Sequence, residues 1–276
     1  MADAVLAALK EIRAVARDRR SGAAELADRA AAAWLRFVRT SKAPPQVFER
    51  QLKSLAKATL AAQPAMAPLL NLACLVLRSV ETVGVDRGRL KRRLARFQRE
   101  LRTANQRIAR RFARRLPPRA VVLTYSRSST VETALLAAKR KIARVIVSEG
   151  RPQLEGRGLA DKLARAGMRV TLVADAALPG KVREADAVVV GADAIALGRY
   201  VNKIGTRVLQ REALALGKPF YVLADNSKIL PAESARRVGK YVARTFERIP
   251  LARGVTVLTE HGPLSHRRYA GATRKT

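Results

Sequence analysis

The segment VVVGADAIALGRYVNKIGT, residues 188–206, gathers a carboxylate, an amide and an ammonium group within a short stretch of chain. Asp193 follows an apolar run directly, and Asn202 and Lys203 follow a Gly-Arg turn. A carboxylate can bind hydroxyl groups or take a proton, and an ammonium group can hold negative charge. The trio would suit a hydroxylated phosphate compound, while an Asp–Lys ion pair closing a structural turn is the alternative reading of the same residues.

A second polar cluster, TYSRSST at residues 124–130, leads straight into a predicted helix. Its hydroxyl groups, including those of Ser126 and Ser128, would gather with backbone N–H groups at a helix N-terminus, where an anion is favoured. Simple N-capping explains one such serine or threonine hydroxyl, but not the other four together with an arginine. A phosphate group would fit at this position.

Two loop arginines, Arg151 and Arg157, follow in the segment SEGRPQLEGR. Each could offer its planar guanidinium to a phosphate or carboxylate group of a ligand. Pairing with Glu149 or Glu155 is the more common fate of such residues, and the spacing leaves both readings open.

Several classes of site are excluded by the sequence. Neither a Gly-x-Gly-x-x-Gly nor a Gly-x-x-x-x-Gly-Lys-Ser/Thr motif is present, so we expect neither a dinucleotide cofactor nor a nucleoside-triphosphatase loop. One cysteine, Cys74, and two histidines offer no metal centre, and we expect no metal or other cofactor. No run of about 18 apolar residues occurs, which predicts a cytoplasmic protein without a membrane span.

The elements that position these side chains fall into two parts. Residues up to about 116 show apolar spacings of three and four, which predicts helices in the segments 23–38, 44–63 and 66–83, and an amphipathic helix at the start. A long basic helix should cover 86–116, and its predicted apolar stripe consists of Leu90, Leu94, Phe97, Leu101, Ile108 and Phe112.

After Pro118 the pattern changes to short β-rich runs separated by helical segments. These runs are 120–125, 143–149, 168–174, 187–192, 219–225 and 255–260. Continuous apolar strands alternating with helices indicate a parallel sheet. We therefore predict an α/β protein in which an N-terminal helical domain, 1–117, precedes a Rossmann-like parallel-sheet domain, 118–276. Ligands bind beyond the carboxyl ends of such strands, where the polar clusters fall.

The formal net charge of +33 predicts attraction to polyanions. RNA or ribosome contact through the basic surface is one interpretation, and an Ala- and Arg-rich composition without functional meaning is the other. Because aromatic residues make up only 4% of the chain, any nucleic-acid contact should be to phosphates.

The motifs SEGRP, VADAA, GADAI, NKIGT and KPFYVLADNSK, in this order, resemble those of the translation initiation factor 2B alpha/beta/delta family. That family also contains ribose-1,5-bisphosphate isomerase and methylthioribose-1-phosphate isomerase. The resemblance covers roughly residues 120–231, and DRRSGAAELADRA near the N-terminus is similar to the family's entry helix. It implies a helical domain followed by a Rossmann-like domain, with a homodimer or larger homo-oligomer formed through the latter.

The resemblance also implies a set of binding residues. Matched by motif, the residues expected to bind a phosphorylated ligand are Arg20, Ser21, Gly22, Ser126, Ser128, Arg151, Asn202 and Lys203. In the family's isomerases, a cysteine after the first strand works with the aspartate of GAD, here Asp193. This chain has Ser126 at the cysteine position, and a serine hydroxyl is far too weak an acid to replace a thiol directly.

Two functions follow from this departure. The first is a regulatory, initiation factor 2B-like protein that binds a sugar phosphate or nucleoside monophosphate without turnover. The alternative is an aldose-ketose sugar-phosphate isomerase of the ribose-1,5-bisphosphate or methylthioribose-1-phosphate type, in which Asp193 acts with water, Tyr125 or another hydroxyl group.

Overall fold

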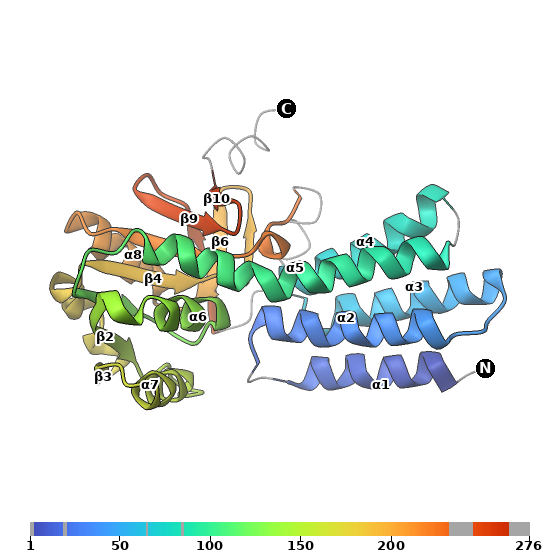
Figure 1. Ribbon diagram of the computed structural model, residues 1–276, viewed down its shortest axis with the longest axis horizontal. Helices are drawn as coiled ribbons and strands as arrows, with labels where there is room; N and C mark the ends of the chain where they lie inside the picture. Colours follow the sequence, from blue (N-terminus) through green and yellow to red (C-terminus); the bar gives the residue numbers. More distant parts are fainter. Residues whose placement is uncertain (1–2, 19–20, 65, 84–85, 232–244, 265–276) are drawn as a thin grey trace. The chain divides into compact units, whose positions relative to one another are not determined.

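The computed structural model describes residues 3–18, 21–64, 66–83, 86–231 and 245–264 (Figure 1). The chain divides into two compact units, one made by the helices up to Thr103 and one that begins at Ala104. This division falls inside a helix, at a point where no proline or glycine interrupts the sequence. Each unit has its own apolar core, and the two are described separately below.

The N-terminal unit is entirely helical in its described residues. Its helices are α1 (Asp3–Arg17), α2 (Ala23–Thr40), α3 (Pro45–Ala62), α4 (Ala67–Val83) and the first part of α5 (Arg87–Ala113). The apolar faces predicted from the sequence meet in one core around Trp34, Phe37 and Phe48, whose side chains are fully buried. The Trp34 indole donates a hydrogen bond to the Thr59 hydroxyl at 3.2 Å, so its buried N–H group is satisfied.

Helix α5 confirms the predicted basic helix, and its apolar stripe contributes to two cores. Leu90, Leu94 and Leu101 are buried in the core of the N-terminal unit. Ile108 and Phe112 are buried against the sheet of the second unit, where the Phe112 ring makes an edge contact with Tyr221. The arginines of this helix lie mostly on its exposed positions, as an amphipathic pattern requires.

The second unit is built on a seven-stranded sheet of order β10-β9-β7-β4-β1-β2-β3. All neighbours are parallel except β9 and β10. The strands are β1 (Ala120–Thr124), β2 (Ile142–Ser148), β3 (Val170–Val173), β4 (Ala187–Gly191), β7 (Phe220–Leu223), β9 (Val255–Thr259) and β10 (Gly262–Pro263). The mixed α/β class and the parallel sheet predicted from the sequence are therefore confirmed.

Helices cover both faces of this sheet, as the apolar strand composition predicts. One core layer contains α6 (Ser129–Ala137), α7 (Glu155–Arg165) and the end of α5, packed on alternate residues of β1, β2 and β4. The opposite layer contains α8 (Thr206–Ala215) and the 3-10 segment η3 (Pro179–Glu184). Among the helices that the structure describes, none has the length and apolar character needed to cross a bilayer.

A small antiparallel sheet was not expected from the sequence. It contains β5 (Ala194–Ala196), β6 (Arg199–Lys203) and β8 (Phe246–Pro250), in the order β5-β6-β8. Asn202 and Lys203, which follow the Gly-Arg turn, therefore lie on a strand that the sequence pattern did not predict. The Gly-Arg turn forms a tight connection, in which Leu197 and Gly198 both have positive φ angles.

Candidate functional site

The topological switch point of the sheet, where the strand order reverses, lies between β1 and β4. The chain proceeds from β1 outward to β2 and β3, then returns to β4 on the other side of β1. In open parallel sheets, ligands bind beyond the carboxyl ends of the strands where the order reverses in this way. The residues that follow β1 and β4 are Tyr125 to Ser128 and Ala192 to Asp193, the two polar segments singled out in the sequence.

The hydroxyl of Ser126, the residue that the sequence analysis matched to a cysteine of the isomerases, contacts an ion pair. It donates a hydrogen bond to Oε1 of Glu155 at 2.9 Å. The same oxygen lies 2.8 Å from Nζ of Lys203, which is also 3.3 Å from Oε1 of Gln153. Only 1% of the Lys203 side chain is exposed, and its ion-pair partner among the described residues is Glu155. The same ammonium group also acts on the carboxylate of Asp175, whose pKa it helps to lower. Ser126 itself has a φ angle of 63°, a strained value for a residue other than glycine.

A second buried ammonium group lies beyond β7. Lys228 ends the 3-10 segment η4 (Asn226–Lys228), and its side chain is 4% exposed. Its Nζ is 3.4 Å from the Thr130 hydroxyl at the start of α6 and 3.8 Å from Oδ2 of Asp225. The sequence analysis did not single out Lys228, although its place just after a predicted strand was a usable signal.

Asp193 lies at the end of β4, as predicted, and it is electrostatically coupled to Lys228. Burial raises the pKa of the Asp193 carboxyl above its ordinary value, while the Lys228 ammonium group acts in the opposite direction. No hydrogen bond or ion pair of this carboxylate is found within the described parts of the chain. Asp193 is thus a partly desolvated carboxyl group under the influence of a cation, and such a group can exchange a proton or bind a hydroxyl group.

Ser128 caps helix α6 at the switch point. Its hydroxyl accepts a hydrogen bond from the backbone N–H of Val131 at 3.4 Å. Gly191 permits this approach, because a Cβ at that position would lie 2.5 Å from the Ser128 hydroxyl oxygen. The N-capping alternative therefore holds for Ser128, and the close approach of β4 brings the end of that strand against the start of α6.

Tyr125 and Asn202 support the backbone around the same region. The Tyr125 hydroxyl donates to the carbonyl of Ile204 at 2.7 Å, and burial raises the pKa of Tyr125 to about 12. The Asn202 amide donates to the Thr206 hydroxyl at 3.2 Å, and that hydroxyl donates to the Lys203 carbonyl. Both side chains therefore hold the turn that follows Lys203.

Buried polar atoms without hydrogen bonds gather at this edge of the sheet. They include Thr124 Oγ1 at the end of β1, Glu155 Oε2 and Asp225 Oδ2, none of which has a hydrogen-bonding partner within the described residues. Buried polar atoms are normally satisfied, and exceptions call for an explanation such as a bound ligand or water. Their position coincides with the two buried ammonium groups.

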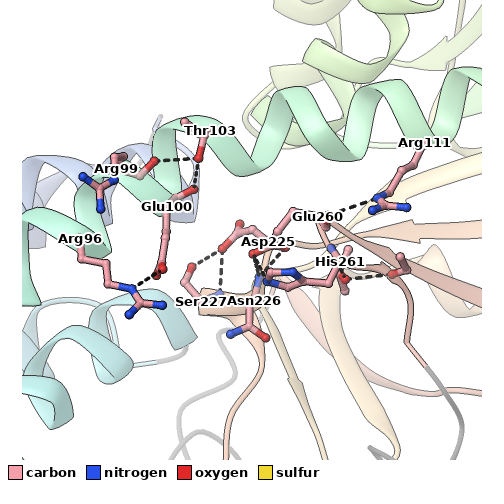
Figure 2. A network of polar contacts seen from close by, with 12 residues as sticks. Arg96, Arg99, Glu100, Thr103, Arg111, Asp225, Asn226, Ser227, Glu260 and His261 are labelled. Carbon is pink, nitrogen blue, oxygen red and sulfur yellow. Dashed lines mark hydrogen bonds and ion pairs between the residues drawn. The ribbon is translucent and has the colours of Figure 1, made fainter.

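A buried glutamate fixes the turn that carries Lys228 (Figure 2). The carboxylate of Glu260, at the end of β9, accepts hydrogen bonds from the backbone N–H of Asn226 at 3.1 and 3.2 Å. The Arg111 side chain donates to the Glu260 carbonyl at 3.2 Å. Burial raises the pKa of the Glu260 carboxyl, and the hydrogen bond from the backbone N–H of Asn226 acts in the opposite direction.

The two loop arginines are paired with a carboxylate of the same segment. Arg151 and Arg157 both pair with Glu149, and Arg151 is 68% exposed. Carboxylate pairing, the alternative weighed from the sequence, is therefore the observed arrangement. No contact joins Arg151 to Asp193 or Lys203 in the described part of the chain, so its binding to a ligand remains a prediction.

The predicted N-terminal contribution belongs to the other unit. Ser21 donates to the Asp18 carboxylate through both its backbone N–H and its hydroxyl, each at 2.9 Å, and Gly22 precedes helix α2. Arg20 lies outside the described residues. The role of all three in phosphate binding remains a prediction.

Comparisons with known proteins agree with this architecture. A sequence profile described as the initiation factor 2 subunit family matches residues 19–244. A ribose 1,5-bisphosphate isomerase from Haloterrigena turkmenica is 36% identical over 216 residues, which are 76% of this chain and 66% of that protein. The chain thus spans about two thirds of that relative's length. A putative translation initiation factor eIF-2B subunit 2-like protein from Pyrococcus horikoshii is 33% identical over 226 residues, 81% of this chain and 79% of that protein.

Solved structures show the same fold. The Pyrococcus horikoshii translation initiation factor eIF-2B has a TM-score of 0.81 at 29% identity, covering 96% of this chain and 98% of that one. A chain of the tetrameric eIF2B-beta2-delta2 complex from C. thermophilum has a TM-score of 0.79 at 22% identity, covering 97% and 94%. The profile match, the similar relatives and the shared fold show that the chain belongs to the initiation factor 2 subunit family.

Proposed function

We propose that this protein binds a phosphorylated sugar, or the ribose phosphate part of a nucleoside monophosphate, at the carboxyl edge of its parallel sheet. The observation that carries the proposal is the presence there of two buried ammonium groups, Lys203 and Lys228, among buried polar atoms without hydrogen bonds. A buried charge is costly unless it is well paired. The phosphate of a phosphorylated sugar could accept further hydrogen bonds from these ammonium groups, and the sugar hydroxyl groups could donate to the carboxylate oxygens of Glu155 and Asp225 that lack a hydrogen bond within the described residues.

Different side chains would bind the phosphate group and the sugar hydroxyl groups of the ligand. The ammonium groups and the N-terminus of α6 suit a phosphate group, because backbone N–H groups and the helix dipole favour an anion there. The Asp193 carboxyl suits a sugar hydroxyl group beside them. The sequence resemblance implies a cysteine where this chain has Ser126, and the Ser126 hydroxyl donates its hydrogen bond to Glu155. Binding without turnover is therefore the first function that we propose.

An isomerase is the second candidate, and two observations favour it. A relative at 36% identity is named ribose 1,5-bisphosphate isomerase, and the raised pKa of Asp193 suits a proton-transfer group. Tyr125 is a poor substitute for the thiol, since its raised pKa and its hydrogen bond to Ile204 hold the phenol proton. Water would therefore have to complete the acid and base pair.

Calorimetric titration with ribose 1,5-bisphosphate, ribose 5-phosphate and AMP tests binding. We expect heat with at least one of them, and a loss of affinity of tenfold or more, about 1.4 kcal/mol, in Asp193→Asn. Asp161→Asn is the matched control, because Asp161 is exposed on α7. Absence of heat with every phosphorylated ligand would refute the proposal.

Turnover is decided separately by NMR of the same mixtures. Unchanged ribose 1,5-bisphosphate and methylthioribose 1-phosphate, in the presence of measured binding, would support the regulatory function. Conversion of either sugar would establish the isomerase instead. A Ser126→Cys variant provides the positive test, because a restored thiol should create or increase turnover if the geometry is otherwise that of the isomerases.

We also propose that the protein assembles as a homo-oligomer. A structurally similar chain comes from a complex described as tetrameric, and two large apolar side chains near the start of α8, Ile204 and Val208, are 52% and 54% exposed. Light scattering coupled to size exclusion measures the mass directly. A double variant Ile204→Ser/Val208→Ser should lower that mass if this surface forms the contact, and a monomeric wild-type protein would contradict the proposal.

A further inference from the structure

The second unit carries an asymmetric charge distribution along its parallel strands. Six segments lead into the amino ends of β1, β2, β3, β4, β7 and β9, and they contain twelve lysines and arginines but only two carboxylates. These segments are residues 114–119, 138–141, 165–169, 179–186, 216–219 and 252–254. Because amino ends of parallel strands meet at one edge of a sheet, the twelve cations share that edge, here called the amino edge.

Overall composition does not account for this asymmetry. The segments that leave the carboxyl ends of the same six strands contain three lysines and arginines and five carboxylates. They are residues 125–128, 149–154, 174–178, 192–193, 224–228 and 260–261. A chain that is simply rich in arginine would carry excess arginine at both edges of the sheet. Here the amino edge has twelve cations and two carboxylates, whereas the carboxyl edge has three cations and five carboxylates.

Part of the amino edge is uncompensated by neighbouring acids. Arg119, Arg140 and Arg169 precede the adjacent strands β1, β2 and β3, and all three are exposed. Their side chains form no hydrogen bond or ion pair within the described residues. Neighbouring strands lie about 4.8 Å apart, so these guanidinium groups start from positions spread over about 10 Å. By contrast, Arg144 and Lys181 nearby are both paired with Glu184.

The chemistry of the amino edge favours a nucleic-acid backbone over a protein. Its six segments contain no phenylalanine, tyrosine or tryptophan. Protein interfaces are enriched in aromatic residues together with arginine, and single-stranded nucleic acids are held by stacking on aromatic side chains, so the lack of aromatic residues argues against both. Arginine and lysine without aromatic residues instead match the phosphodiester groups of a duplex, which require no stacking and carry no direct sequence information.

We propose that the amino edge binds the phosphodiester backbone of a double-stranded nucleic acid without sequence specificity. The charge asymmetry and the unpaired arginines support this assignment, which does not depend on the ligand proposed for the carboxyl edge. Because the two edges are opposite ends of the same strands, a sugar phosphate and a duplex can bind at once. If binding depended only on the total charge of the protein, removing three arginines from any exposed surface would weaken it equally.

Fluorescence anisotropy with labelled RNA and DNA duplexes of equal length measures the binding over a series of KCl concentrations. The test variant of the full chain is Arg119→Gln/Arg140→Gln/Arg169→Gln. The control, Arg13→Gln/Arg39→Gln/Arg50→Gln, removes the same charge from exposed helix positions of the N-terminal unit that have no ion pair within the described residues. Thermal unfolding by circular dichroism checks that both variants fold, as exposed substitutions should allow.

The expected result is a shallower salt dependence for the test variant. Removing one arginine that binds a phosphate lowers the slope of log Kobs against log salt by about 0.9, so removing three should lower it by about two to three, with affinity at physiological salt falling about tenfold. The control should change affinity by no more than about twofold. Binding of one duplex type over the other would identify the source of the phosphates and would still support the proposal.

Three results would overturn it. Equal losses of affinity in the test and control variants would mean that net charge, not the amino edge, causes binding. A wild-type protein that fails to bind either duplex at physiological salt would remove the interaction itself. Polyglutamate of matched charge that binds as tightly as the duplexes, with the same loss in the test variant, would assign the amino edge to acidic protein partners.

Discussion

Replacing Glu155 by glutamine should destabilise the ligand-free protein by about 3 kcal/mol. The change removes the carboxylate 2.8 Å from the ammonium group of Lys203, whose side chain is 1% exposed against 16% for Glu155. Removing one partner of a buried ion pair costs about 3–5 kcal/mol, because the remaining charge is left desolvated. The low end applies here, since Gln153 still accepts from Lys203 and the new amide oxygen can still accept from Ser126.

Urea denaturation followed by circular dichroism gives the free energy of unfolding. The single tryptophan, Trp34, lies in the N-terminal unit, so its fluorescence does not report on the unit that carries Glu155. Glu49→Gln is the matched control: it breaks a Lys–Glu pair of 2.6 Å whose side chains are 57% and 38% exposed, and such surface pairs contribute little. The double variant Glu155→Gln/Lys203→Met should recover part of the loss, because the unpaired charge is gone.

Two outcomes would refute this reasoning. If Glu155→Gln costs no more than Glu49→Gln, Lys203 does not depend on a buried carboxylate. If the double variant is less stable than Glu155→Gln alone, the cost comes from packing and not from the unpaired ammonium group. A saturating sugar phosphate should also stabilise Glu155→Gln more than the wild-type protein, because a phosphate would replace the lost negative charge.

Three further predictions concern single side chains. Burial raises the pKa of Asp193 above 3.8, so the folded state holds this proton more tightly than the unfolded state. The resulting contribution to the free energy of unfolding is present below pH 3.8 and is lost as pH rises through the folded pKa. In a pH series of urea denaturations Asp193→Asn should flatten that part of the curve, and an unchanged curve would contradict the assignment. In the same assay Gly191→Ala should lower the free energy of unfolding by about 1–3 kcal/mol, because the new Cβ would lie 2.5 Å from the Ser128 hydroxyl oxygen. The control Gly180→Ala should have little effect, because no atom lies within 4 Å of the added Cβ. Equal effects of the two substitutions would argue against the clash. Thr59→Val should cost about 1–3 kcal/mol and alter the emission of Trp34, because the buried indole N–H loses its acceptor, and an unchanged stability and spectrum would show that this hydrogen bond is dispensable.

Most of the fold could be predicted because the apolar pattern is strong. The six strands of the parallel sheet are short continuous apolar runs, and the N-terminal helices show regular spacing. The small sheet was missed for a physical reason: β5 has only three residues, β6 is RYVNK, and their partner β8 lies more than forty residues beyond β6 in sequence. Such pairing is decided by tertiary packing, which local pattern does not reveal.

The candidate site could be located but not assembled from the sequence. Asp193 and Ser126 follow strands, and topology brings the ends of those strands together. Lys228 was missed, because ADNSK has the composition of an exposed turn and the burial of a lysine depends on neighbours distant in sequence. Glu155 was considered only as a partner for loop arginines, whereas it pairs with Lys203 on a strand that was not expected.

Amide hydrogen exchange, with and without a saturating sugar phosphate, tests most directly where a ligand binds. Our account predicts slower exchange in residues 126–131, 153–156 and 224–228, the segments that hold Ser126, Glu155 and Lys228, with no change at 138–141 on the opposite edge of the sheet. Protection confined to other segments, despite saturation confirmed by calorimetry, would contradict it.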